Sequence, residues 1–167
     1  MSLFRQSAIA IVCLGLMSAT YAAKTVEIEL FDGKGKTTPI GTVTLTDTAY
    51  GLVIQPNLKN LPAGLHGFHI HDHASCDHNG MDASGHLDPA NTGKHMGPYD
   101  NSGHLGDLPA LIVAANGTAT LEVLAPKLKL SDLDNHAMMI HAGGDNYSDQ
   151  PEKLGGGGAR IACGVIK

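Results

Sequence analysis

The sequence contains no tryptophan, and aromatic side chains make up only 4% of its 167 residues. Its most apolar stretch, residues 8–17, is much shorter than the roughly 20 residues that a membrane-spanning helix needs. Basic residues are also few, because 11 Lys and Arg face 16 Asp and Glu and form no basic block. These absences argue against a transmembrane helix and against nucleic acid or a membrane surface as a partner.

The first 22 residues have the features of a secretory signal peptide. Arg5 provides the positive start, residues 8–17 the short apolar run, and Thr20, Tyr21 and Ala22 a cleavage site. We therefore predict a signal peptide over residues 1–22 and a single domain over residues 23–167. Cys13 leaves open a lipoprotein, although that cleavage requires a small residue where Val12 stands.

Removal of the signal peptide leaves two cysteines, Cys76 and Cys163. In an exported chain such a pair most simply forms a disulfide. Closing this long loop would constrain the unfolded chain by about 4–5 kcal/mol in the entropy model. The alternative is a pair of thiolate metal ligands, which the abundance of imidazoles makes less necessary.

Alternating apolar and polar residues predict about eight short strands, with no window of helical periodicity. Pro56 is expected to stop the third strand, and Asn116-Gly117 predicts a hairpin. An antiparallel sandwich or barrel of the all-β class follows. The predicted strands span residues 24–31, 41–46, 50–55, 65–71, 111–114, 118–124, 137–141 and 160–166.

The segment 66–107 holds eight of the ten histidines, six aspartates and seven glycines. It is too polar to order itself by burial and longer than most structureless connections. Imidazoles and carboxylates at this density predict that bound metal supplies the ordering free energy. The alternative is a solvated polar loop.

His69 and His71 lie two residues apart on a predicted strand, so their rings project from one face, about 6.5–7 Å apart. This spacing lets both imidazoles reach one ion. Phe68 and Ile70 point the other way, toward the core. His66 shares their face and is therefore interpreted as a buried structural histidine.

A second set, His86, His95, His104 and Asp107, follows at intervals of nine, nine and three residues. Three ring nitrogens and one carboxylate oxygen suit a closed tetrahedral zinc site. The spacing alone is only suggestive, because it matches no single zinc motif.

Six motifs from about residue 65 to the C-terminus carry a resemblance to a known family: GFHIH, GHLDP, GKHMGP, GHLGDL, HAGGDNYSD and GGGGARIACGVI. In this order they resemble the copper–zinc superoxide dismutases, in particular the exported bacterial form. The resemblance implies a Greek-key β-barrel with a long metal-binding loop and a glycine-rich active-site loop.

The resemblance also implies a role for each matching residue. Asp145 would link a copper histidine to a zinc histidine, Arg160 would receive the anion beside copper, and Cys76 would pair with Cys163. The implied copper ligands are His69, His71, His86 and His141, and the implied zinc ligands are His86, His95, His104 and Asp107.

The implied activity is conversion of superoxide to dioxygen and hydrogen peroxide in the periplasm, by a protein with one copper and one zinc per subunit. A homodimer is possible. The alternative is a periplasmic copper- or zinc-binding protein without turnover, although storage would require neither Arg160 nor Asp145.

Steering of an anion requires local positive charge, because the net charge is −5. Lys153 could supply it at the rim of the site. His73 stands where bacterial relatives often carry a lysine, which suggests stronger steering below about pH 6.5. His78 and His136 are expected to be solvated.

Overall fold

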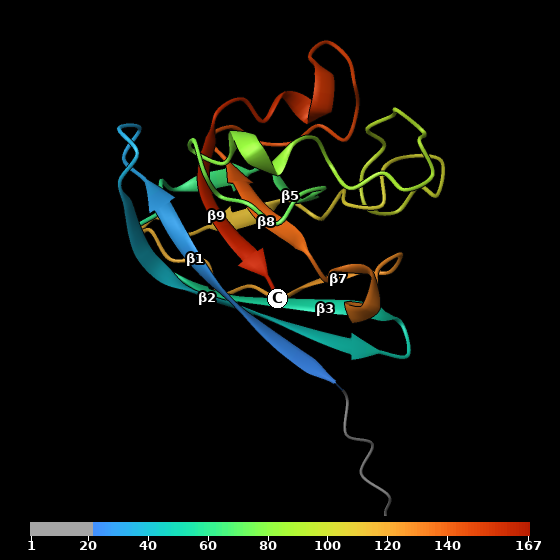
Figure 1. Cartoon of the computed structure of the whole chain (residues 1–167), viewed down its shortest axis with the longest axis horizontal. Coiled ribbons are helices and arrows are strands. Elements are labelled where there is room, and N and C mark those ends of the chain that lie inside the picture. The colour runs from blue at the N-terminus through green and yellow to red at the C-terminus, as the bar shows by residue number, and fades with distance from the viewer. Residues whose placement is uncertain (1–21) are drawn as a thin grey trace, which may run out of the picture.

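The computed structural model describes residues 22–167, whose regular structure consists of antiparallel β-strands joined by turns and long loops (Figure 1). The loops contain three short 3₁₀ helices, η1 (Met81–Ala83), η2 (Leu130–Asp132) and η3 (Lys153–Gly156). Of the signal peptide predicted over residues 1–22, all but Ala22 lies outside the described residues. Among residues 22–167 no helix is long and apolar enough to cross a membrane.

Seven strands form one curled sheet in the order β5-β8-β9-β1-β2-β3-β7, and β4 and β6 form a second sheet of two strands. All paired strands are antiparallel, and the non-sequential order places the C-terminal strand beside the first. The all-β class is confirmed, with nine strands rather than about eight. The strands are β1 (Ala23–Phe31), β2 (Thr37–Thr48), β3 (Gly51–Leu58), β4 (Gly64–His66), β5 (Phe68–His71), β6 (Leu111–Val113), β7 (Val123–Ala125), β8 (His136–His141) and β9 (Arg160–Ile166).

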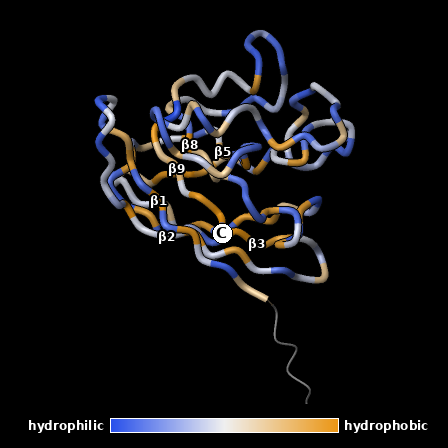
Figure 2. Tube along the Cα trace, in the orientation of Figure 1, coloured by the Kyte–Doolittle hydropathy of each residue, from blue (hydrophilic) through white to orange (hydrophobic). Residues whose placement is uncertain are grey.

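Alternating side chains of these strands fill one apolar core. Val26 and Ile28 of β1 and Val43 and Leu45 of β2 are almost wholly buried, and they pack with Phe68 and other apolar residues. The hydrophobic colour in Figure 2 accordingly concentrates on the strands, while the long loops at one end are largely hydrophilic. The barrel therefore folds on apolar burial, and the polar loops rest on it.

Residues 65–71 form two strands instead of the single strand that the sequence predicts. β4 pairs with β6, β5 pairs with β8, and Gly67 lies between them. A Cβ on Gly67 would lie 3.1 Å from the ring of His69 and 3.4 Å from Cβ of His141. A larger residue at this position would therefore press on the two histidines where the chain changes sheets.

The predicted hairpin at Asn116-Gly117 is also wrong. The turn exists, with a bond from Ala114 N–H to Thr118 O of 2.8 Å, but β6 pairs with β4 and β7 with β3. Strand β7 is correspondingly shorter than predicted.

Pro56 does not stop β3, which continues to Leu58. β7 pairs only with Leu52–Ile54, so the position of Pro56 needs no N–H donor on that side.

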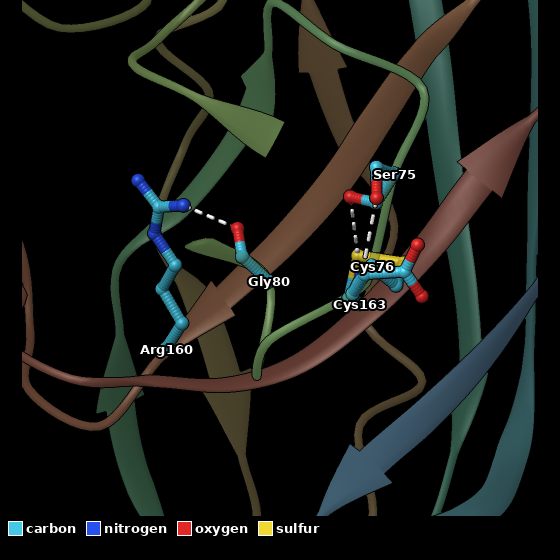
Figure 3. Close-up of a disulfide and its surroundings, with 6 residues drawn as sticks. Ser75, Cys76, Gly80, Arg160 and Cys163 are labelled. Atoms are coloured by element: carbon cyan, nitrogen blue, oxygen red, sulfur yellow. Dashed lines mark hydrogen bonds between the residues drawn. A yellow bond between two sulfur atoms is a disulfide. The ribbon is translucent and has the colours of Figure 1, made fainter. Parts of the chain in front are cut away.

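The disulfide between Cys76 and Cys163 is confirmed, with a Cα–Cα distance of 5.7 Å (Figure 3). It ties the long loop between β5 and β6, which we call the polar loop, to β9 across 87 positions of the sequence. Three residues along β9, Arg160 reaches the same loop and donates to Gly80 O. The strand therefore holds the loop at two points.

Candidate metal centre

Strand β5 forms backbone hydrogen bonds with two parts of the polar loop that carry potential metal ligands. Ile70 N–H donates to Gly106 O, and Leu87 N–H donates to Ile70 O, at 2.9 and 2.8 Å. These bonds place His86 opposite His71 and Asp107 opposite His69 as isolated bridge pairs. Two parts of the polar loop thus dock on β5 through their backbones.

The first group consists of four buried imidazoles whose potential ligand atoms lie within 4.8 Å of one another. We call it the copper group: His69, His71, His86 and His141. Burial, reinforced by the neighbouring histidines, lowers the pKa of His69 to about 3, of His71 to about 2 and of His141 to about 4. Neutral rings keep their lone pairs free for a metal ion.

The second group meets the same distance criterion and shares one ring with the first. We call it the zinc group: His86, His95, His104 and Asp107. Asp107 Oδ1 lies 3.0, 2.9 and 3.3 Å from the Nδ1 atoms of the three rings. Asp107 Oδ2 accepts the N–H groups of Met96 and Gly97 at 3.1 Å each. Hydrogen bonds from the rings outweigh burial and hold the pKa of this carboxyl well below its usual range.

Asp145 connects the two groups. Its Oδ2 accepts from His69 Nε2 at 2.7 Å, and its Oδ1 accepts from His95 Nε2 at 2.8 Å. Burial alone would lower the pKa of His95, but the carboxylates of Asp107 and Asp145 raise it to about 9. Asp145 thus orients the rings of His69 and His95 by binding the Nε2 atom of each, and leaves the Nδ1 atom of each facing its own group.

Unpaired ring nitrogens test whether these residues fit metal ions. Six buried side-chain polar atoms of the described residues lack a hydrogen-bond partner, and five belong to this centre. They are His69 Nδ1, His71 Nε2, His86 Nε2, His141 Nε2 and His95 Nδ1, the last of which lies 2.9 Å from Asp107 Oδ1 but makes no well-aligned hydrogen bond. Buried polar atoms are rarely left unpaired, so the donor set fits two cations.

One group is open to solvent and the other is not. A pocket of about 430 Å³ is bordered by His71, His86 and His141, with Lys153 and Arg160 on its wall. Arg160 donates to Gly80 O and Ser84 O, and Ser84 O also accepts from His71 Nδ1 at 2.9 Å. A small anion entering this pocket therefore meets two cationic side chains beside the copper group and one carboxylate, that of Glu152.

The glycine-rich loop packs tightly against both groups. A Cβ on Gly157 would lie 3.1 Å from Cβ of His141, and one on Gly155 would overlap Asp145 Oδ1. The absence of Cβ atoms at these two positions allows this close packing.

The remaining histidines lie outside both groups. His66 is buried as expected, with its ring nitrogens 2.7 Å from His141 O and 2.8 Å from Pro62 O. His73 and His78 are exposed, and His78 pairs with Asp82 at 2.9 Å. His136 is half-buried rather than fully solvated and donates to Asp72 O at 2.6 Å.

Sequence reasoning missed Asp149. Its carboxylate accepts His95 N–H at 2.8 Å and Leu154 N–H at 3.1 Å, which joins the zinc group to the pocket rim. No spacing indicates such a role, because both partners are backbone groups.

Comparison with known proteins agrees with this geometry. The sequence profile of the family described as Copper/zinc superoxide dismutase (SODC) matches residues 39–166. A Cu-Zn superoxide dismutase of Legionella pneumophila is 55% identical over 152 residues, covering 91% of this chain and 93% of the relative.

Two solved structures share the fold. The Cu/Zn superoxide dismutase from Brucella abortus matches with a TM-score of 0.82 at 43% identity, covering 87% of this chain and all of the other. The monomeric enzyme from Salmonella enterica matches with a TM-score of 0.76 at 52% identity, with the same coverage.

Proposed function

The chain belongs to the copper/zinc superoxide dismutase family, and we propose that it converts two superoxide ions and two protons into dioxygen and hydrogen peroxide. The observation that carries this proposal is the shared ring of His86. Its Nδ1 lies in the zinc group, and its unpaired Nε2 belongs to the copper group. Two neighbouring cation sites joined by one imidazole serve a redox reaction better than storage.

In this proposal His69, His71, His86 and His141 hold copper, and His86, His95, His104 and Asp107 hold zinc. Copper bound here would supply one-electron exchange between its two oxidation states, whereas zinc has no redox chemistry.

The protein's own groups bind the anion and handle the proton. Arg160 stays charged at working pH and presents donors to superoxide in the pocket. His86 Nε2 faces the copper group without a protein partner, so whenever this nitrogen is not bound to copper it can hold a proton and release it to the reduced substrate. Asp107 and Asp145 keep the surrounding rings oriented throughout.

Metal analysis combined with a superoxide-consumption assay on the protein lacking residues 1–22 tests the function. One copper and one zinc per chain with rapid consumption is expected. Both metals bound without consumption would favour the alternative, a copper- or zinc-binding protein without turnover.

We also propose that residues 1–22 are removed on export to the periplasm. β1 starts at Ala23, so this cleavage leaves every described strand complete. N-terminal sequencing of the protein from a periplasmic fraction should begin at Ala23, and a start at Met1 would contradict export.

A homodimer remains a prediction of the sequence. The Salmonella enterica relative is described as monomeric, so the family resemblance does not decide it. Sedimentation velocity of the metal-loaded protein at micromolar concentration would separate the two states.

A further inference from the structure

Lys127 lies two residues after the end of β7, and its side chain reaches the long polar loop between β5 and β6. Its Nζ donates to Gly97 O at 3.1 Å, to Asp100 O at 2.8 Å and to His104 O at 2.9 Å. An ammonium group has three donors, so all of them are used by carbonyls of one loop segment. A side chain that was merely solvated would not be saturated in this way.

The backbone around Lys127 is anchored to the barrel. Ala125 ends β7 and is buried, and Leu128 is buried in the core. The ammonium group therefore projects from a fixed base, two residues beyond a paired strand. It can hold the loop carbonyls without moving with the loop.

The three carbonyls belong to the part of the loop that carries the zinc group. Gly97 donates its N–H to Asp107 Oδ2 and offers its carbonyl to Lys127, so one peptide segment is held from both sides. His104 is itself in the zinc group, and its carbonyl accepts from Lys127. Two of the three bonds of Lys127 thus end on residues that belong to the zinc group or donate to it, His104 and Gly97.

We propose that Lys127 is a positioning residue that orders residues 97–104 before zinc binds, so that zinc affinity depends on it. The inference rests on the zinc assignment proposed above. It changes one expectation drawn from the sequence, because metal is then not the only source of order in this segment. A charged donor that is built into the barrel contributes part of it.

The test compares zinc retention of Lys127→Met, Lys127→Arg and Lys129→Met, each as the metal-loaded protein titrated with a zinc chelator. Lys129 is exposed and lies two residues further on, so it controls for loss of a positive charge nearby. We expect Lys127→Met to lose zinc about tenfold more readily, as for other residues that support a metal ligand. Lys127→Arg, which keeps a charged donor, and Lys129→Met should each stay within about threefold of the wild type.

Amide hydrogen exchange provides a second readout. Lys127→Met should speed exchange in residues 94–107 and leave β1 to β3 unchanged. Wild-type zinc retention in Lys127→Met would overturn the inference. So would amide exchange that is accelerated as much in the barrel strands as in residues 94–107. If the wild type itself binds no zinc, the proposed function fails instead.

Discussion

The copper group and the zinc group share His86 but are built in different ways. In the copper group, His69, His71 and His141 lie on paired strands of the barrel. In the zinc group, all four residues lie in the polar loop and are held by carboxylates, backbone bonds and Lys127. The pairing register of the strands fixes the positions of these copper-group histidines, and a network of polar contacts fixes the positions of the zinc-group residues.

The difference also appears in charge and access. Burial keeps the copper-group rings neutral, while two carboxylates raise the pKa of His95 to about 9. The pocket reaches the copper group but is not bordered by His95, His104 or Asp107. A strand-borne, open and neutral group suits turnover, and a loop-borne, closed and charged group suits a structural ion.

Removing one ligand from each group gives the largest expected contrast. His71→Ala should abolish superoxide consumption above background while zinc content stays near that of the wild type. His104→Ala should lose zinc but retain copper and measurable consumption. Metal analysis and the consumption assay on the same samples check both, and equal loss of both metals in both variants would contradict two separable groups.

The two groups also differ in how well the sequence predicts the positions of their residues. The alternation over residues 68–71 correctly predicts that His69 and His71 come together. In contrast, His86 and Asp107 are placed by backbone bonds of Ile70, Leu87 and Gly106, which leave no side-chain pattern. Lys127 and Asp149 likewise contact backbone groups and could not be found from spacing.

Prediction of the fold from the sequence is limited in a similar way. Propensity and alternation locate most strands and the turn at Asn116-Gly117. They do not reveal which strands pair, because the partners of β6 and β7 lie on other segments. Strand pairing depends on the packing of the whole barrel.

Replacing the connection between the groups is expected to weaken both. In Asp145→Asn, one carboxylate oxygen is replaced by an NH2 group, which cannot accept the hydrogen bond from His69 or His95. We expect metal affinity to fall by about 10–100-fold, with zinc the more affected because His95 is then also less basic. Competitive titration with chelators measures it. Asp134→Asn, at an exposed site whose carboxylate pairs with Lys24 and with neither group, is the control and should change neither affinity.

In the metal-free protein His95 and the strand-borne histidines of the copper group should have opposite pH dependences. Unfolded histidines titrate near pH 6.5, above the pKa values of about 3, 2 and 4 for His69, His71 and His141. The unfolded chain then binds more protons in acid, so stability falls as the pH drops below about 6.5. The slope is up to about 1.4 kcal/mol per pH unit for each ring.

His95 has the opposite sign. Its raised pKa of about 9 means that the folded chain binds the extra proton, so its contribution is complete below about pH 6.5 and is lost as the pH rises through 9. Urea unfolding of chelator-treated protein should therefore show a stability maximum near pH 6.5. Rising stability from pH 6.5 to 9 would refute the charge assigned to His95.

Charge at the pocket rim should affect only the open group. Lys153→Met is expected to lower the rate of superoxide consumption about two- to threefold at low salt, and the difference should vanish near 0.5 M salt. Zinc affinity should not change. Lys36→Met, an equal charge change at an exposed site that does not border the pocket, is the control.

The smallest effect is expected at His73, whose proposed steering role depends on protonation. His73 does not border the pocket, and its Nε2 lies 3.5 Å from Asp72 Oδ2, so a charge gained there is partly offset. At acidic pH and low salt, the wild type should exceed His73→Gln by less than about twofold. Identical pH and salt profiles would remove the role altogether. A difference larger than that of Lys153→Met would mean that the loop carrying His73, rather than the pocket wall, sets the field that the anion meets.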